Sequence, residues 1–227
     1  MRISYIVFLA SCFSLRVFAQ QSEVRQIGSF QGIRSSEAID VFLKKGDKES
    51  IKVEVSGTDL ANVVTELMGS TLKIHMRDQK FLGRRTVKVY VTYTRLEKIS
   101  ASSASNVFSE GVIKSDNLGI AISSAASVEV NVESESLIVE ASSAGNSVLE
   151  GKVKSLEIEA RSAGDIDAYR LESEKVYVRT SSGGSAKINV TKELEAHASS
   201  GGSIRYRGNP VKTNTDSSSG GSVKKTN

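Results

Sequence analysis

A four-residue phrase that begins with serine recurs seven times in the C-terminal half of this 227-residue chain, at a nearly constant interval. The copies begin at Ser103, Ser124, Ser143, Ser162, Ser182, Ser200 and Ser219, so that successive copies lie 21, 19, 19, 20, 18 and 19 residues apart. Such a short, fixed period is typical of a solenoid, whose repeats must stack because none can bury its apolar face alone. The repeat restricts the fold more than any other feature.

The residues ahead of each phrase alternate between apolar and polar, as in strands with one buried face. Aligned on the phrase, the apolar positions form three columns: Leu118, Leu137, Leu156, Val176 and Leu194; Ile99, Ile120, Val139, Ile158, Val178 and Ala196; and Ala101, Ile122, Ala141, Ala160, Thr180 and Ala198. The first serine of each phrase continues this series, so we expect it to face inward too. A column after the phrase, which Ser147 and Ala186 interrupt, predicts a second strand: Val107, Val128, Ile166, Ile204 and Val223. The pattern predicts an all-β protein whose residues 97–223 form a parallel β-helix of about seven rungs of 18–21 residues.

The small residues of the phrase suit a corner where equivalent turns stack about 4.8 Å apart. Glycine holds the third place of the last five copies: Gly145, Gly164, Gly184, Gly202 and Gly221. We expect these structural turn glycines to adopt positive φ, which glycine does at little cost. On that interpretation, Gly164→Val should destabilise the protein more than Ser105→Val, by on the order of 1 kcal/mol.

Residues 28–96 lack the phrase but keep the period-two alternation. Two apolar runs, 39–43 and 51–55, flank a polar turn and predict a hairpin, while residues 59–64 are a weak candidate for a short helical turn. Further strands are expected at Leu72–Met76 and Val87–Val91, with a loop at 77–85 between them. Because an uncovered solenoid end exposes unpaired strand edges, we expect this antiparallel or mixed β-region to cap the first rung.

The first residues predict export. Arg2 precedes an apolar run, and small residues before Gln20 resemble a cleavage site, so residues 1–19 are interpreted as a signal peptide. The only cysteine, Cys12, ends a segment that also resembles a lipoprotein box, which we regard as the weaker interpretation because the apolar run continues beyond it. We expect a periplasmic, outer-membrane-associated or extracellular protein, held at the membrane only if Cys12 is lipidated.

The hairpin segment, the alternating 72–76 stretch and repeats such as Glu159-Ala160-Arg161-Ser162-Ala163-Gly164-Asp165-Ile166 resemble the family called putative auto-transporter adhesin, head GIN domain. The resemblance covers roughly residues 30–223. It implies a right-handed β-helix outside the cytoplasm, in a family of exported Bacteroidetes proteins whose domain has no known function. It brings no catalytic residues, and adhesion enters only as a hypothesis.

A net charge of +4, spread over many charges of both signs, argues against a nucleic-acid partner. Two separated histidines and no cysteine after the predicted cleavage make a transition-metal site improbable, and we expect no cofactor. Asp165 and Asp167 follow a glycine turn as in calcium-binding β-rolls, but other repeats lack these carboxylates. A speculative surface patch combines five charged or ionisable residues: Glu140, Glu159, Arg161, Arg179 and His197. The simplest interpretation of this patch is a solvated face.

These observations favour a non-enzymatic structural, adhesion or binding module at the cell envelope, with a cell-surface glycan or protein as its partner. The alternative is a carbohydrate-processing enzyme, similar to polysaccharide lyases or hydrolases, that uses the charged outer face. No catalytic residues can be named. A third possibility is a homo-oligomer that forms through the C-terminal rung, since the sequence ends just after the seventh turn without an evident cap.

Overall fold

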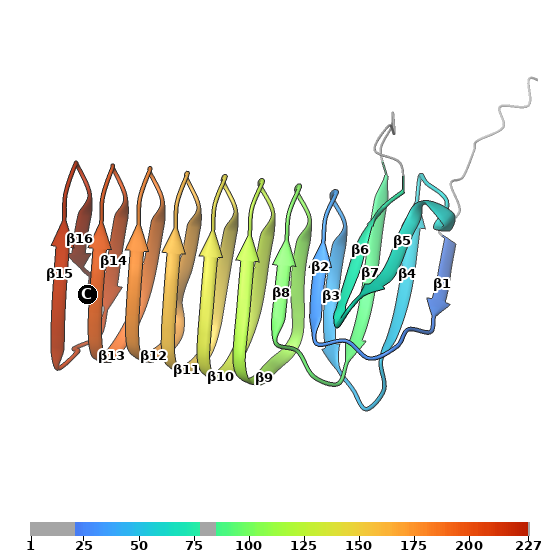
Figure 1. Cartoon of the computed structure of the whole chain (residues 1–227), viewed down its shortest axis with the longest axis horizontal. Coiled ribbons are helices and arrows are strands. Elements are labelled where there is room, and N and C mark those ends of the chain that lie inside the picture. Colours follow the sequence, from blue (N-terminus) through green and yellow to red (C-terminus); the bar gives the residue numbers. More distant parts are fainter. Residues whose placement is uncertain (1–20, 78–84, 227) are drawn as a thin grey trace, which may run out of the picture.

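The computed structural model describes residues 21–77 and 85–226, so the predicted signal peptide and Cys12 lie outside the described residues. This part of the chain forms an elongated all-β solenoid whose rungs stack along the long axis (Figure 1). Its elements are β1 Gln21–Arg25, β2 Gly32–Ser35, β3 Asp40–Lys45, β4 Ser50–Ser56, the 3-10 helix η1 Leu60–Asn62, β5 Val63–Met68, β6 Thr71–Met76, β7 Thr86–Tyr93, β8 Lys98–Ala101, β9 Asn106–Ile122, β10 Ser127–Ala141, β11 Asn146–Ala160, β12 Asp165–Thr180, β13 Ser185–Ala198, β14 Ser203–Arg207, β15 Lys212–Ser217 and β16 Ser222–Lys225.

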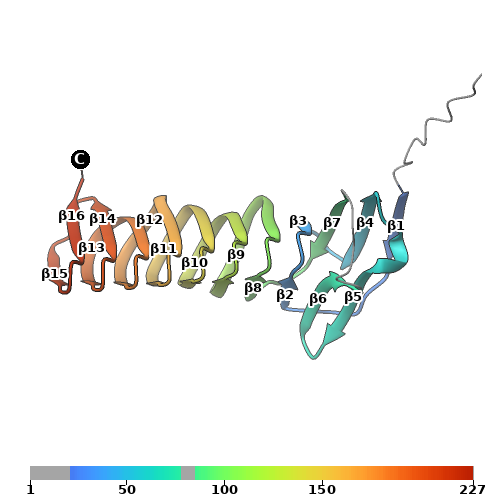
Figure 2. The same cartoon turned by 90° about the horizontal axis from the view of Figure 1, so that it is seen from above.

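Each long strand supplies both faces of the solenoid. In Figure 1 the chain descends the back face, bends at the bottom edge, climbs the front face and crosses at a narrow tip to begin the next rung. The advance toward the C-terminus in this sense makes a right-handed helix, as the family resemblance implies. Figure 2 shows the two faces as two layers, with β2, β8 and β15 in the front layer and β3, β14 and β16 in the back layer.

Successive rungs pair in parallel and place equivalent residues side by side. Leu137 of β10 pairs with Leu118 of β9 and with Leu156 of β11, for example. All three predicted apolar columns are buried, with exposures of 0–3%. Ser147 and Ala186 also lie inward and are fully buried, in register with Val128 and Ile166, so the column after the turn is continuous in space.

The tips correct two expectations about the phrase. Its first serine is exposed in every copy and not inward, because it lies in the turn, beyond the end of the strand. The positive φ angles belong to the first and second places, such as Ser162 at 49° and Ala163 at 60°. The hydrogen bond from the Gly164 N–H to the Arg161 carbonyl, at 2.9 Å, closes a four-residue turn with positive φ at both central residues, the pattern of a type I′ turn.

The third-place glycines therefore have a different role from the one expected, since none of them has positive φ. A Cβ atom built on Gly164 would lie 2.4 Å from the Ala141 carbonyl oxygen of the preceding rung, and one built on Gly184 would lie 2.2 Å from that of Ala160. Such contacts are far inside van der Waals distance. Glycine is required here by the close approach of stacked backbones.

One more tip of this kind precedes the seven. Glu37 and Ala38 have φ angles of 67° and 57° and connect β2 to β3. β2 pairs in parallel with β8, and β3 pairs in parallel with β9, so Ser36–Ile39 stacks on the first phrase. The Ala38 N–H donates to the Ser103 carbonyl at 2.9 Å, which ties the two tips together.

The N-terminal region is mixed β-structure, but the predicted hairpin is wrong. β7 lies between β3 and β4, parallel to the first and antiparallel to the second. The strands expected at 72–76 and 87–91 are confirmed as β6 and β7, and the weak helical turn is η1. β6 and β7 each pair with an antiparallel strand on the side away from the solenoid, β5 and β4 respectively, so the parallel stacking ends there. Most of the loop expected at 77–85 lies outside the described residues.

The last rung differs from the others in its inward positions. Where most earlier rungs carry apolar residues, β15 carries Thr213, Thr215 and Ser217, all exposed. On the front face the buried core therefore ends one rung earlier, at Leu194, Ala196 and Ala198, whereas on the back face it reaches Ile204 of β14. Polar side chains meet water at this end of the solenoid.

Candidate functional site

The predicted surface patch lies on the front face. Four of its members occupy one outward ladder, in which Glu140 pairs with Glu159, Glu159 with Arg179, and Arg179 with His197. The fifth, Arg161, lies two residues beyond Glu159 and forms an ion pair with it at 3.1 Å. Because adjacent rungs lie about 4.8 Å apart, Glu140 and His197 are separated by about 14 Å. The patch is a stripe along the solenoid and not one compact site.

The C-terminal half of this stripe contains the residue that sequence reasoning missed, Tyr177. The Arg179 guanidinium lies 5.4 Å from the Tyr177 ring centroid, and the His197 ring lies 6.0 Å from it in a tilted contact. His197 Nε2 lies 3.0 Å from a Glu195 carboxylate oxygen, and Nδ1 lies 4.0 Å from Asp216. We call Tyr177, Arg179, Glu195 and His197 the front cluster. Its sequence signal was an aromatic residue at an outward position.

Two shallow hollows flank the stripe. One of about 360 Å³ lies beside Tyr177 and is lined by residues of four rungs, including Lys175, Glu195 and Asn214. A smaller one of about 200 Å³ lies beside Glu140 and Arg161. Of the predicted patch, Glu140 and Arg161 thus line the smaller hollow, whereas Tyr177 and Glu195 of the front cluster line the larger one.

The chemistry available to the front cluster is that of recognition. Tyrosine and arginine offer stacking surface and hydrogen-bond donors, and the carboxylates accept hydrogen bonds. Within residues 21–77 and 85–226, no group of three histidine, cysteine, aspartate or glutamate side chains could hold a metal ion. His197 contacts carboxylates and an aromatic ring, and within the described part of the chain its hydrogen bond is to Glu195 and not to a serine or threonine hydroxyl.

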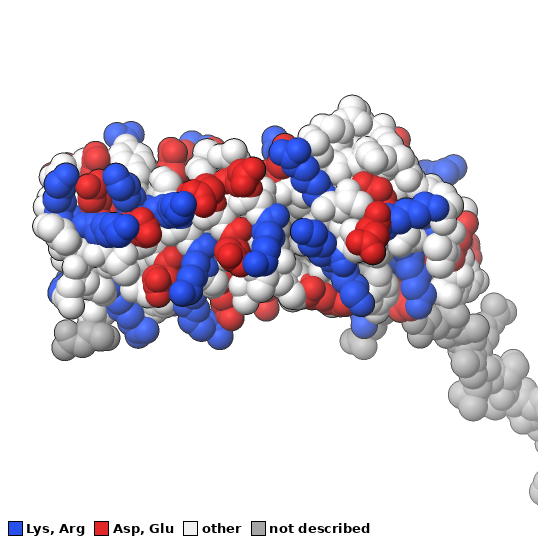
Figure 3. All heavy atoms as spheres, turned by 90° about the horizontal axis from the view of Figure 1, so that it is seen from below, with Lys and Arg blue, Asp and Glu red and all other residues white. Residues whose placement is uncertain are grey.

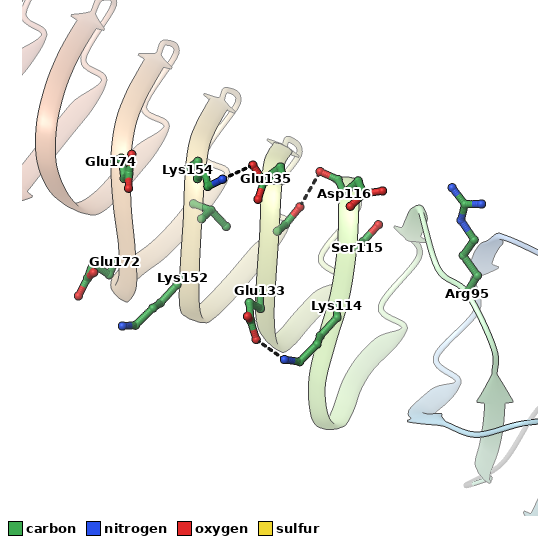
Figure 4. A pocket seen from close by; sticks show the side chains of 12 residues that line it. Arg95, Lys114, Ser115, Asp116, Glu133, Glu135, Lys152, Lys154, Glu172 and Glu174 are labelled. Atoms are coloured by element: carbon green, nitrogen blue, oxygen red, sulfur yellow. Dashed lines mark hydrogen bonds and ion pairs between the residues drawn. The ribbon is translucent and has the colours of Figure 1, made fainter.

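A larger hollow, of about 530 Å³, lies elsewhere, along the bottom edge where the strands bend (Figure 4). Its walls carry charges that alternate from rung to rung, as in the ladder Lys114, Glu133, Lys152 and Glu172. Lys114 bridges Glu133 at 2.7 Å, and Figure 3 shows blue and red side chains interleaved along this edge.

A second line of ion pairs follows the same edge. Lys154 bridges Glu135 at 2.7 Å, and Lys192 bridges Glu174 at 2.6 Å. Hydrogen bonding to Glu135 raises the pKa of Lys154, and hydrogen bonding to Lys192 lowers the pKa of Glu174. These exposed pairs neutralise one another, add little stability because solvent screens them, and leave little uncompensated charge for a ligand.

Comparison with solved structures reveals similar folds at low sequence identity. A putative adhesin from Bacteroides fragilis NCTC 9343 superposes with a TM-score of 0.83 and 19% identity, covering 92% of this chain and 97% of that chain. A putative lipid binding protein from Parabacteroides distasonis ATCC 8503 has a TM-score of 0.71 and 18% identity, with coverages of 92% and 97%. A putative adhesin from Parabacteroides merdae ATCC 43184 has a TM-score of 0.63 and 18% identity, with coverages of 92% and 96%. At these identities the likeness shows the fold alone.

Comparison with curated proteins finds no match. The described part of the chain has no helix with the length and hydrophobicity of a membrane span. A family model described as "putative auto-transporter adhesin, head GIN domain" matches residues 29–210. The match covers most of the chain, so the protein belongs to this family, as its repeats indicate.

Proposed function

We propose that this protein is an exported, non-enzymatic adhesion or binding module at the cell envelope, and that the front cluster is its contact surface. The observation that carries the proposal is the grouping of Tyr177, Arg179 and His197 on adjacent rungs, each at an outward position of the same face. Tyrosine and arginine supply a disproportionate share of binding energy at protein interfaces. A glycan or a protein of the cell surface is the expected partner.

The scaffold supports this role because it holds the cluster in fixed positions. Residues 176–180 of β12 pair without a register shift with 156–160 on one side and with 194–198 on the other. Side chains anchored on such ladders lose little freedom on binding, which favours affinity. The adhesin and lipid-binding descriptions of structurally similar proteins are consistent with a binding role.

A binding screen tests the proposal. Purified protein from residue 21 onward would be applied to arrays of bacterial and host surface glycans and to whole envelope preparations. Tyr177→Ala and Arg179→Ala should each weaken the detected binding at least tenfold, whereas Ser142→Ala, on the same face but outside the cluster, should leave it unchanged. Binding that is equally strong in all variants would contradict the assignment of the surface. Release of oligosaccharide from a glycan, lost in Glu140→Gln or Glu159→Gln, would establish the enzymatic alternative.

Export needs its own test. Cell fractionation combined with a labelled fatty acid would show whether the chain leaves the cytoplasm and whether Cys12 carries lipid. We expect export without label, and the same distribution for Cys12→Ser. Lipid incorporation that Cys12→Ser abolishes would instead establish a lipoprotein, and retention in the cytoplasm would contradict export.

A further inference from the structure

Three aromatic rings form a stack on the outer surface of the back face, near its N-terminal end. Tyr90 of β7, Phe42 of β3 and Phe108 of β9 lie at equivalent positions on adjacent parallel strands. The centroids of Phe42 and Tyr90 are 5.1 Å apart, those of Phe42 and Phe108 are 5.3 Å apart, and the planes differ by 19° and 21°. All three rings are partly exposed. Each ring is fixed in orientation by its neighbour.

The two ends of the stack differ. At one end, the Lys52 ammonium lies 5.7 Å from the Tyr90 ring centroid. At the other end, one face of Phe108 is stacked on Phe42, so its second face points along the solenoid toward β10. That second face borders a hollow of about 340 Å³. The stack thus presents one rigid ring face to an open depression.

A β-bulge forms the hollow. The pairing of β9 with β10 skips residues between Phe108 and Val112, and Gly111 within the bulge has a φ of 98°. The Ser109 hydroxyl accepts a hydrogen bond from the Asn131 N–H at 3.0 Å, which anchors the displaced backbone. The strand is therefore deformed next to the free ring face, as is common where a bulge redirects side chains at a binding site.

Hydrogen-bonding groups surround this ring face. Exposed Glu129 stands beside Phe108 on the next rung, and Val148 follows on the rung after that. Phe108 and Val148 are thus two rungs apart, about 9.6 Å, with exposed Glu129 between them, so a ring stacked on Phe108 would lie against the Glu129 side chain. On the remaining sides lie Asn131 and the ion pair of Arg170 with Glu150, whose nitrogen and oxygen are 2.5 Å apart.

From this arrangement we propose that the hollow beside Phe108 binds a neutral sugar ring, stacked on the free face of Phe108 and hydrogen-bonded through its hydroxyl groups to Glu129, Asn131, Glu150 and Arg170. One side of a pyranose presents C–H groups that suit the electron-rich face of an aromatic ring. Carboxylates, an amide and a guanidinium are suitable partners for hydroxyl groups. A purely apolar ligand would desolvate Glu129 and Asn131 without compensation, and two carboxylates disfavour an anionic ligand.

This inference rests on the proposed function in one respect, namely that an exported domain encounters glycans. The site itself is separate, because Phe108 lies on the back face and the front cluster on the opposite one. The two proposals therefore make different predictions for the same set of variants.

Saturation-transfer NMR with the protein from residue 21 onward tests the site. The probes are the methyl glycosides of glucose, galactose, mannose and N-acetylglucosamine, together with their short oligosaccharides. At least one should receive transfer, strongest at the C–H protons of one ring face. Phe108→Ala should lower its affinity at least tenfold and Glu129→Gln several-fold, while Phe108→Tyr and Tyr177→Ala should leave it unchanged. Melting curves of each variant would show that the fold is retained.

Each alternative outcome has a defined meaning. If no probe receives transfer, or if Phe108→Ala binds as well as the wild type, the sugar site is refuted while the front cluster keeps its own test. If Tyr177→Ala abolishes sugar binding and Phe108→Ala does not, the glycan is bound on the front face, which supports the proposed function and refutes the site at Phe108. If Phe108→Ala loses its melting transition, the sugar affinities of the other two variants decide. Weaker binding by Glu129→Gln with unchanged binding by Tyr177→Ala supports the site, and equal binding by both refutes it.

Discussion

The tip of the repeat offers a sharp test of how the rungs stack, because adjacent residues in it face opposite constraints. Ala163 has a φ of 60° without being glycine, whereas Gly164 is glycine without having positive φ. The first residue is strained by its backbone conformation and the second is limited by space. Exchanging alanine and glycine at these two positions should therefore have effects of opposite sign.

For Gly164→Ala, the new Cβ would lie 2.4 Å from the Ala141 carbonyl oxygen, 2.6 Å from its carbon and 3.0 Å from the Ser142 nitrogen. The Ala141 carbonyl also accepts the Arg161 N–H at 2.9 Å, so it cannot move away without weakening the ladder between the rungs. Overpacking against backbone should cost about 3 kcal/mol, the upper end of the usual range. For a domain of this size, that lowers the melting temperature by about 6–12 °C.

For Ala163→Gly, removing the Cβ relieves about 1–2 kcal/mol of left-handed strain. The greater freedom of glycine in the unfolded chain offsets about 0.4–1 kcal/mol of this gain. The variant should be at least as stable as the wild type and melt up to about 5 °C higher. The matched control is Gly183→Ala, because Gly183 has a φ of 73° and open space around its Cβ, so it should lose only about 1 kcal/mol.

Thermal unfolding followed by circular dichroism, at several scan rates, would rank the variants. From the highest melting temperature to the lowest, the expected order is Ala163→Gly, wild type, Gly183→Ala and then Gly164→Ala. Equal losses for Gly164→Ala and Gly183→Ala would refute the steric argument, since it assigns the clash to the third place alone. Gly164→Val should also remain worse than Ser105→Val, because Ser105 already carries a Cβ and is buried in that place.

Three further predictions concern other parts of the solenoid. Arg205 lies between Lys187 and Lys224 in one ladder, so Arg205→Glu should restore alternating charge and raise the melting temperature by about 1–3 °C at low salt, an effect that should vanish in 1 M NaCl. Burial raises the pKa of Tyr93 above its ordinary value of 10.0, so the free energy of unfolding falls as pH rises from 10.0 through the folded-state pKa. Tyr93→Phe should flatten this fall when stability is measured by denaturant titration at each pH, and an unchanged dependence on pH would contradict the assignment. Thr213→Leu combined with Thr215→Val would place an apolar surface on the last rung, and sedimentation should then show association that increases with concentration.

The inward columns could be predicted because two periods in the sequence determine them together. The alternation within a strand assigns each residue to a face, and the recurrence near nineteen residues aligns the rungs. The same counting failed at Ser143, since the alternation ends with the strand at Ala141 and the turn swings the next residues outward. The tip at Ser36–Ile39 was missed because Glu37 stands where the phrase begins with serine and its third place holds a buried isoleucine.

Strand partners were harder to predict than strands. Residues 39–43 and 51–55 carry the pattern of a hairpin, but alternation describes which face a residue takes and not which strand lies beside it. β7 separates the two because its own apolar positions, Val87, Val89 and Val91, are buried in the same layer. The aromatic stack could not be predicted for the same reason, since Phe42, Tyr90 and Phe108 recur with no fixed period.

Stacking also explains where a ligand can be recognised on such a chain. Inward positions are buried and mostly apolar, and the third-place glycines leave no space for a side chain, so neither can be adapted to a partner without loss of stability. Outward positions meet only their copies one rung away, and along the bottom edge this contact selects alternating charges. The front cluster around Tyr177 and the stack ending at Phe108 depart from that alternation, and both place aromatic faces beside hollows. Their side chains are not required by the stacking of the rungs, which makes these two surfaces the places where binding specificity can reside.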